Sequence, residues 1–147
     1  MIGGSFGLTM IGGLLVVLGR RGRDPGRLAS RRFGLSAMVA GLFLRVWAAH
    51  TLGRYYTRTL RVAPDQPVVR AGPYRFIRHP GYLADLALWI GFGLALGSRF
   101  LTVLIAGTMA LAYSRRIDAE EALLLDRLGV AYRDYQRQSW RLLPPVY

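Results

Sequence analysis

The chain has 147 residues, of which 52% are hydrophobic, and a formal net charge of +12. A chain of this length forms one domain at most. Its combination of apolar and basic residues disfavours a soluble domain and is typical of membrane spans with basic flanks. The lack of cysteine excludes disulfides, a thiolate zinc site and a thiol nucleophile. The arginines cluster between apolar runs and not along one amphipathic face, which argues against nucleic-acid binding.

The first apolar run covers residues 1–19 and contains no charged residue. Its length is enough to cross about 30 Å of hydrocarbon at about 1.5 Å per residue. A cleaved signal peptide is the alternative, but it would carry basic residues before the apolar stretch. Here six arginines follow the run, in residues 20–32. We therefore predict a retained span followed by a polar loop.

Three further apolar runs cover residues 33–53, 81–97 and 99–114. Arg45 interrupts the first of these, and Asp85 lies near the start of the second. Each run is long enough to be read as a membrane helix. The sequence therefore predicts four spans.

The last two spans are joined by a very short connection of Ser98 and Arg99, which predicts a tight antiparallel hairpin. Small residues at a helix interface allow close backbone approach. We expect the hairpin to pack through such residues, namely Gly91, Gly93 and Gly97 against Ala106, Gly107 and Ala110.

The tail, residues 115–147, differs from the spans. Residues 119–125 are strong helix formers, and Gly129 is a plausible helix stop. A second short amphipathic helix is expected to hold Tyr132, Tyr135 and Trp140, aromatic residues that suit a water–lipid interface. The predicted fold is an all-α integral membrane protein, a single domain with about four transmembrane helices and one or two carboxy-terminal amphipathic helices.

The distribution of arginine sets the expected orientation. With four spans, the loop of residues 54–80 and the tail lie at one membrane face and together carry twelve arginines, against seven in the other connections. Basic residues favour the cytosolic side, so we expect the loop and the tail to face the cytosol. The arginines of residues 20–32 lie at the opposite face and contradict this rule.

Polar residues cluster where the chain enters the third span. Residues 72–82 read Gly-Pro-Tyr-Arg-Phe-Ile-Arg-His-Pro-Gly-Tyr. Gly72-Pro73 indicates a tight turn, and Pro80 suits the first turn of a helix. The backbone N–H groups after Pro80 would then attract a carboxylate or phosphate. An ordinary helix start with interfacial arginine and tyrosine anchors explains the same pattern.

Two further charged positions allow more than one interpretation. Arg116 and Glu120 stand four residues apart on one helical face, as a surface ion pair or as part of a site beside the loop. Arg45 lies inside a span, where a charge requires a partner. Either Asp85 or a substrate anion would serve. His50 and His79 lack further ligands at suitable spacing, so we expect no metal site.

Several short segments resemble one known family when taken in order. They are Leu52-Gly53-Arg54-Tyr55-Tyr56, Val69-Arg70-Ala71-Gly72-Pro73-Tyr74, Arg78-His79-Pro80-Gly81-Tyr82, Glu120-Glu121, Leu128-Gly129, Tyr132, Tyr135 and Pro144. Residues 42–145 thereby resemble the isoprenylcysteine carboxyl methyltransferase family in a short prokaryotic form. The resemblance implies an S-adenosylmethionine-dependent carboxyl O-methyltransferase in the membrane, without the Rossmann-like sheet of other methyltransferases.

The resemblance also implies roles for individual residues. Arg45 and Glu120 are expected at the catalytic centre, with Arg45 and Arg116 near the substrate. The expected cofactor-binding residues are Gln66, Pro67, Val68, Val69, Tyr74, His79, Pro80, Gly81, Tyr82 and Glu120. The chain departs from the family at Asp85, where apolar or small residues are usual, and in having fewer spans than eukaryotic members.

The expected substrate is a prenylcysteine-like or other lipophilic acid that enters from the bilayer, and S-adenosylhomocysteine is the expected product. The expected location is a bacterial inner membrane, with the active site facing the cytosol and membrane lipid around the spans. Two other functions stay open: methylation of a phospholipid or other lipid amine, and a non-catalytic membrane scaffold.

Overall fold

The computed structural model describes residues 25–56 and 67–145. The predicted first span, residues 1–19, and Gln66 lie outside this part of the chain. The described elements, in order, are α2 (Pro25–Leu52), the 3₁₀ turns η1 (Gly53–Tyr55) and η2 (Gly72–Arg75), α3 (Pro80–Ala95), α4 (Arg99–Leu128) and α5 (Val130–Gln138).

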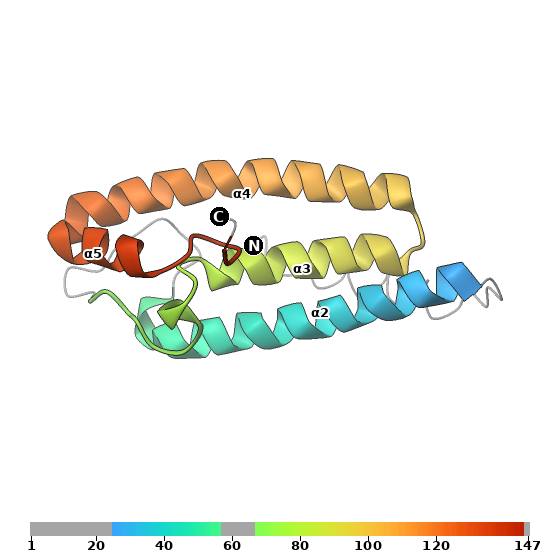
Figure 1. Ribbon diagram of the computed structural model, residues 1–147, viewed down its shortest axis with the longest axis horizontal. Coiled ribbons are helices and arrows are strands. Elements are labelled where there is room, and N and C mark those ends of the chain that lie inside the picture. Colours follow the sequence, from blue (N-terminus) through green and yellow to red (C-terminus); the bar gives the residue numbers. More distant parts are fainter. Residues whose placement is uncertain (1–24, 57–66, 146–147) are drawn as a thin grey trace.

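The long helices lie roughly side by side, with α3 between α2 and α4 (Figure 1). The described residues form no sheet, only an isolated bridge between Ile77 and Trp140. The expectation of an all-helical fold is therefore confirmed for the described part of the chain. The helix hairpin is also confirmed, since α3 and α4 are joined by a short turn in which Gly97 adopts a φ of 71°.

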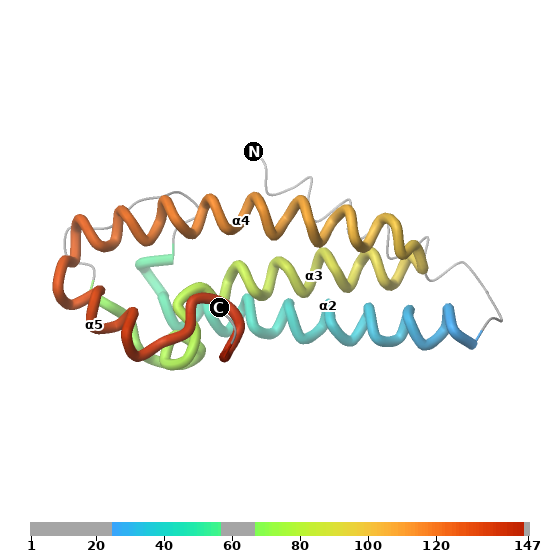
Figure 2. Tube along the Cα trace, turned by 45° about the horizontal axis from the view of Figure 1, so that its top comes forward, coloured from blue at the N-terminus to red at the C-terminus, as the bar shows by residue number. Residues whose placement is uncertain are grey.

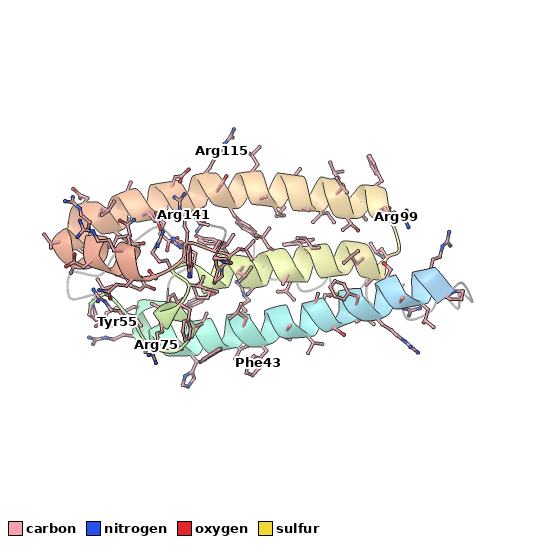
Figure 3. The ribbon with its side chains drawn as sticks, in the orientation of Figure 1. Phe43, Tyr55, Arg75, Arg99, Arg115 and Arg141 are labelled. Carbon is pink, nitrogen blue, oxygen red and sulfur yellow. The ribbon has the colours of Figure 1, made fainter. Side chains whose placement is uncertain are left out.

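Two of the described helices are long and apolar enough to cross a membrane: α2, counted together with the turn η1 that continues it, and α4. Helix α3 is apolar but shorter. Large apolar side chains project outward from α2 and α4, among them Phe33, Phe43 and Phe100 (Figure 3 labels Phe43). The count of four spans stays a prediction, because one of them lies outside the described residues.

Helices α2 and α3 pack through small residues spaced seven apart. The buried residues of α2 are Gly34, Gly41 and Ala48. A Cβ atom added at Gly34 would stand 2.5 Å from the carbonyl oxygen of Gly91, and one at Gly41 would stand 2.8 Å from that of Ala84. Such spacing keeps one face of each helix in contact with its neighbour. The two backbones therefore approach as closely as glycine allows.

The predicted packing of the hairpin is only partly right. Gly93 contacts Thr102 of α4, as expected for the hairpin. Gly91 instead packs against Gly34 of α2, and no atom lies within 4 Å of a Cβ added at Gly107. The reason is that α3 turns its most tightly packed small residues toward α2, while Gly107 lies on an open face of α4.

Helix α4 is longer than the predicted span of residues 99–114. It continues without a break to Leu128, because residues 115–128 contain no proline or glycine and are rich in helix formers. The predicted stop at Gly129 is confirmed, where the backbone adopts a φ of 55° that glycine tolerates well. The tail therefore forms one separate helix, α5, which holds Tyr132 and Tyr135, whereas Trp140 follows it.

Candidate functional site

The carboxy-terminal part of α4 lies against the residues that lead into α3. Proline occupies the first turn of α3, as predicted, and His79 immediately precedes it. The hydroxyl group of Tyr82 donates a hydrogen bond to Glu120 Oε2 at 2.7 Å and accepts one from Arg116 Nε at 2.8 Å. Tyr82 thus bridges the two residues of α4 that the sequence placed on one helical face.

Glu121 is the centre of a second, buried set of contacts. Its Oε1 accepts a hydrogen bond from Arg78 Nε at 2.8 Å and lies 3.1 Å from His79 Nε2. Its Oε2 accepts a hydrogen bond from Gln136 Nε2 at 3.3 Å and lies 3.2 Å from Arg141 Nε. Only 8% of Glu121 and 4% of His79 is exposed. This carboxylate therefore joins the loop before α3, helices α4 and α5, and the carboxy-terminal segment.

The electrostatics of Glu121 follow from these contacts. Burial alone would raise the pKa of the carboxyl group, but hydrogen bonds from His79 and Arg78 and the positive charge of Arg78 outweigh it and lower the pKa to about 2. Glu121 is therefore a carboxylate at neutral pH. Buried charges of this kind need several partners to offset their loss of hydration.

The carboxy-terminal segment runs beside the residues that enter α3, as Figures 1 and 2 both show. Backbone hydrogen bonds connect Arg78 N to Trp140 O at 2.8 Å, Trp140 N to Phe76 O at 2.8 Å, and His79 N to Arg141 O at 3.2 Å. Arg141 also pairs with Asp118 of α4. These contacts fix the position of His79 from the backbone side.

The turn η2 is connected to α5 by a side-chain hydrogen bond. Tyr74 is buried, and its carbonyl oxygen accepts a hydrogen bond from the hydroxyl group of Tyr135 at 2.6 Å. Burial, and then the negative charge of Glu120, raise the pKa of the Tyr74 phenol. Burial likewise raises the pKa of Tyr135 to about 12. Both phenols are therefore neutral hydrogen-bonding groups at physiological pH.

The other predicted cofactor residues lie on the approach to this corner. Val68 and Val69 are half-buried and Pro67 is exposed, in the extended segment before η2. A Cβ added at Gly81 would meet no atom within 4 Å, so open space adjoins the start of α3. The predicted residues Tyr74, His79, Pro80, Gly81, Tyr82, Arg116 and Glu120 therefore gather at one end of the bundle.

Arg45 lies on α2, apart from this hydrogen-bonded cluster, and forms an ion pair with Asp85 of α3. Its Nη2 atom also donates to the hydroxyl group of Tyr56, at 3.4 Å. The structure therefore shows the first of the two partners considered for Arg45, the carboxylate of Asp85. A guanidinium group carries five N–H donors, so a second carboxylate could bind beside Asp85.

An apolar cavity of about 430 Å³ lies between α3, α4 and the carboxy-terminal segment. Leu86, Ala110, Leu111, Tyr113, Ile117 and Leu142 are among its lining residues. The ring of Tyr113 packs against that of Tyr82, with centroids 5.3 Å apart and the ring planes inclined at 36°. The cavity therefore adjoins the Tyr82–Glu120 contact, and its volume lies in the range of about 300–1,000 Å³ that is usual for small-molecule sites.

The arrangement suits a ligand with both a cationic and an anionic part. Glu120 provides an acceptor for a cation, Arg116 provides a positive charge, and Tyr82 and Tyr113 provide aromatic surface. S-adenosylmethionine, which the sequence resemblance implies, carries both kinds of charge. Within residues 25–56 and 67–145, no three His, Cys, Asp or Glu side chains gather as metal ligands would.

Sequence reasoning overlooked the residues that hold the corner together. Arg78 and Glu121 belong to the segments that resemble the family, but no role was predicted for either. The signal that could have identified them is the cost of burying a charge near a membrane, which requires a partner for each. Gln136 and Arg141 gave no signal, because their partners lie far away in the sequence.

Comparison with known proteins bears on this arrangement. Residues 34–126 match the model of the isoprenylcysteine carboxyl methyltransferase (ICMT) family. A probable protein-S-isoprenylcysteine O-methyltransferase of Oryza sativa subsp. indica is 30% identical over 113 residues, which are 76% of this chain and 59% of that protein. The protein-S-isoprenylcysteine O-methyltransferase of Dictyostelium discoideum is 26% identical over 116 residues, 78% of this chain and 49% of that protein.

A similar fold occurs among solved structures. The eukaryotic intramembrane Ras methyltransferase ICMT superposes on 99% of this chain and 54% of its own length, with a TM-score of 0.77 and 22% sequence identity. The chain thus spans between about half and three fifths of the length of the relatives that it matches.

Proposed function

The chain belongs to the isoprenylcysteine carboxyl methyltransferase family, and from this premise we propose that it transfers a methyl group from S-adenosylmethionine to the carboxylate of a lipophilic acid. The observation that carries the proposal is the contact of Tyr82 with Glu120, 2.7 Å between oxygen atoms. It joins the residues at the start of α3 to α4 beside an apolar cavity. A polar cofactor site and an apolar substrate site would then adjoin.

The cofactor supplies a methyl group bound to a positively charged sulfur. Glu120 would accept hydrogen bonds from a cationic or hydroxyl part of it. The backbone N–H groups at the start of α3 would bind its carboxylate, as helix amino termini do. The remaining cofactor-binding residues in this proposal are Gln66, Pro67, Val68, Val69, Tyr74, His79, Pro80, Gly81 and Tyr82.

The acceptor carboxylate is already ionised at neutral pH, so the reaction requires no general base. What the protein must provide is alignment of the acceptor oxygen and exclusion of water. Arg45 would orient the carboxylate, because its guanidinium binds such groups with two parallel hydrogen bonds. Asp85 would fix the guanidinium, and Arg116 would contact the substrate nearer the cofactor.

The lipophilic part of the substrate would occupy the cavity between α3 and α4. Leu111 lines this cavity and is also among the exposed large apolar residues, so an apolar chain could enter sideways from lipid. A prenylcysteine-like acid has the required combination of an apolar tail and a terminal carboxylate. The proposed location is a bacterial inner membrane, with the site facing the cytosol.

Product analysis tests this function against lipid-amine methylation. The purified protein is incubated with methyl-labelled S-adenosylmethionine and either a farnesylcysteine analogue or phosphatidylethanolamine. We expect label on the acid in a form that alkali releases, because esters hydrolyse and N-methyl groups do not. Label that alkali does not release as methanol and that stays on the nitrogen of the phosphatidylethanolamine headgroup, or no transfer to either compound, would contradict the proposal.

A further inference from the structure

A second cavity, of about 330 Å³, lies at the end of the bundle opposite the candidate site. The start of α2 and the turn between α3 and α4 meet there, and Arg99 is labelled at that end in Figure 3. Arg27 and Ser30 of α2 line the cavity together with Ser98, Arg99 and Thr102. Nothing in the proposed methyl transfer uses these residues.

The charge at this end is one-sided. Residues 25–36 and 92–104 contain Arg27, Arg31, Arg32 and Arg99 but no aspartate or glutamate. Over the longer segment of residues 20–32, six arginines accompany one aspartate. An excess of this kind attracts anions, and phosphate above all suits the guanidinium group.

The hydroxyl groups beside the arginines add a donor. Ser98 Oγ accepts a hydrogen bond from the backbone N–H of Leu101 at 3.2 Å. Because a serine hydroxyl can donate as well as accept, Ser98 keeps its own O–H for a ligand. Arg27 and Arg99 are both exposed side chains that can reach the mouth of the cavity.

Apolar side chains surround this basic end and distinguish a lipid from a free anion. Phe33 follows the arginines on α2 and is 68% exposed, and Phe100 adjoins Arg99 and is 78% exposed. Leu28, on the same helix, is 42% exposed. In a membrane these side chains would lie against acyl chains, which places the headgroup of a neighbouring phospholipid beside the arginines.

We propose that the cavity between Arg27 and Arg99 binds the phosphate headgroup of an anionic phospholipid, whose acyl chains lie along α2 and α4. Arg27, Arg31 and Arg32, which belong to the predicted non-cytosolic connection that contradicts the usual preference of basic residues for the cytosol, are then part of a lipid-binding surface. The site is separate from the proposed catalytic site and does not depend on its activity.

Binding to the detergent-purified full chain tests the proposal, with native mass spectrometry as the readout. Phosphatidylglycerol is compared with phosphatidylcholine and with inorganic phosphate. We expect phosphatidylglycerol to bind at least about tenfold more tightly than phosphatidylcholine, because each arginine near a lipid surface contributes about a fivefold gain. Equal binding of the two lipids, or inorganic phosphate that displaces phosphatidylglycerol at equal concentration, would overturn it.

Variants locate the site. The double variant Arg27→Gln/Arg99→Gln should weaken phosphatidylglycerol binding about tenfold or more, whereas Arg27→Lys/Arg99→Lys should keep it within about threefold. The matched control Arg115→Gln/Arg133→Gln removes two exposed arginines elsewhere and should leave binding unchanged. An equal loss in the control and the test variant would contradict the assignment.

Discussion

The phenol oxygen of Tyr82 lies between Glu120 Oε2, 2.7 Å away, and Arg116 Nε, 2.8 Å away. One side chain at the start of α3 thus connects two charged residues of α4. Because Arg116 and Glu120 face the same side of their helix, the hydroxyl group fixes both without burying either charge fully. The proposed cofactor site depends on this arrangement.

Removing the hydroxyl group of Tyr82 should weaken ligand binding while the protein still folds. In Tyr82→Phe the aromatic ring remains against Tyr113, but Glu120 and Arg116 lose their shared partner. A hydrogen bond to a charged group contributes about 1.5–3 kcal/mol, so we expect S-adenosylhomocysteine to bind at least about tenfold more weakly, measured by calorimetry. Unchanged affinity would remove Tyr82 from the proposed site.

The adjacent glutamates should behave differently on mutation. Glu121→Gln leaves Arg78 and Arg141 without a buried counter-charge, and such a change costs about 3–5 kcal/mol. Glu120→Gln affects a half-buried side chain with fewer partners and should alter stability by less than about 1 kcal/mol. Thermal unfolding in detergent measures both, and similar losses in the two variants would contradict the distinction.

The pKa of Glu121 predicts how stability depends on pH. It is about 2 in the folded protein, against an ordinary value of 4.5. Between these values the unfolded chain binds the proton more readily, so stability rises with pH through this window. The contribution of Glu121 should be complete above about pH 4.5 and disappear as the pH falls toward 2. Unfolding of the Glu121→Gln variant should depend less on pH over that range.

The close contact of α2 with α3 gives a prediction with an internal control. Gly34→Ala places a methyl group 2.5 Å from the Gly91 carbonyl oxygen, which forces the helices apart and should cost about 1–3 kcal/mol. Gly107→Ala meets no atom within 4 Å and should be neutral or stabilising by up to about 1 kcal/mol. Equal melting temperatures for the two variants would contradict the packing.

A double variant separates the two roles of Arg45. If Arg45 only neutralises Asp85, then Arg45→Leu/Asp85→Leu should restore what Arg45→Leu alone loses, because apolar pairs can replace buried ion pairs. We expect the double variant to regain stability yet remain at least about a hundredfold less active on a lipophilic acid. Recovery of turnover would show that Arg45 is a structural residue.

Local sequence signals predicted which segments are helical, although α2 begins at Pro25, inside the predicted loop of residues 20–32. They predicted less well which helices pack together. The helix start at Pro80 and the helix stop at Gly129 are confirmed, because proline and glycine have strong local conformational preferences. The predicted end of the last span, near residue 114, stays a prediction, but the helix itself continues to Leu128, since charged helix formers continue a helix as readily as apolar ones. A membrane span and a helix therefore need not share an end.

Contacts between residues that are distant in the sequence could not be predicted from local patterns. Glycine at position 91 indicates close approach but not to which helix, and it packs on Gly34 instead of on α4. Glu121 and Arg141 are distant in the sequence, and only the parallel course of the carboxy-terminal segment beside residues 76–79 brings them together. The pairing of Arg45 with Asp85 was foreseen as one of two alternatives, because charges within a span need partners.

The most direct test of the account is calorimetric titration of S-adenosylhomocysteine into the full chain purified in detergent. We expect saturable binding to one site per chain, weakened at least about tenfold in Glu120→Gln and unchanged in the control Arg115→Gln. No detectable binding to the wild-type chain, or equal affinity for both variants, would contradict the claim that the start of α3 and the end of α4 together hold the cofactor.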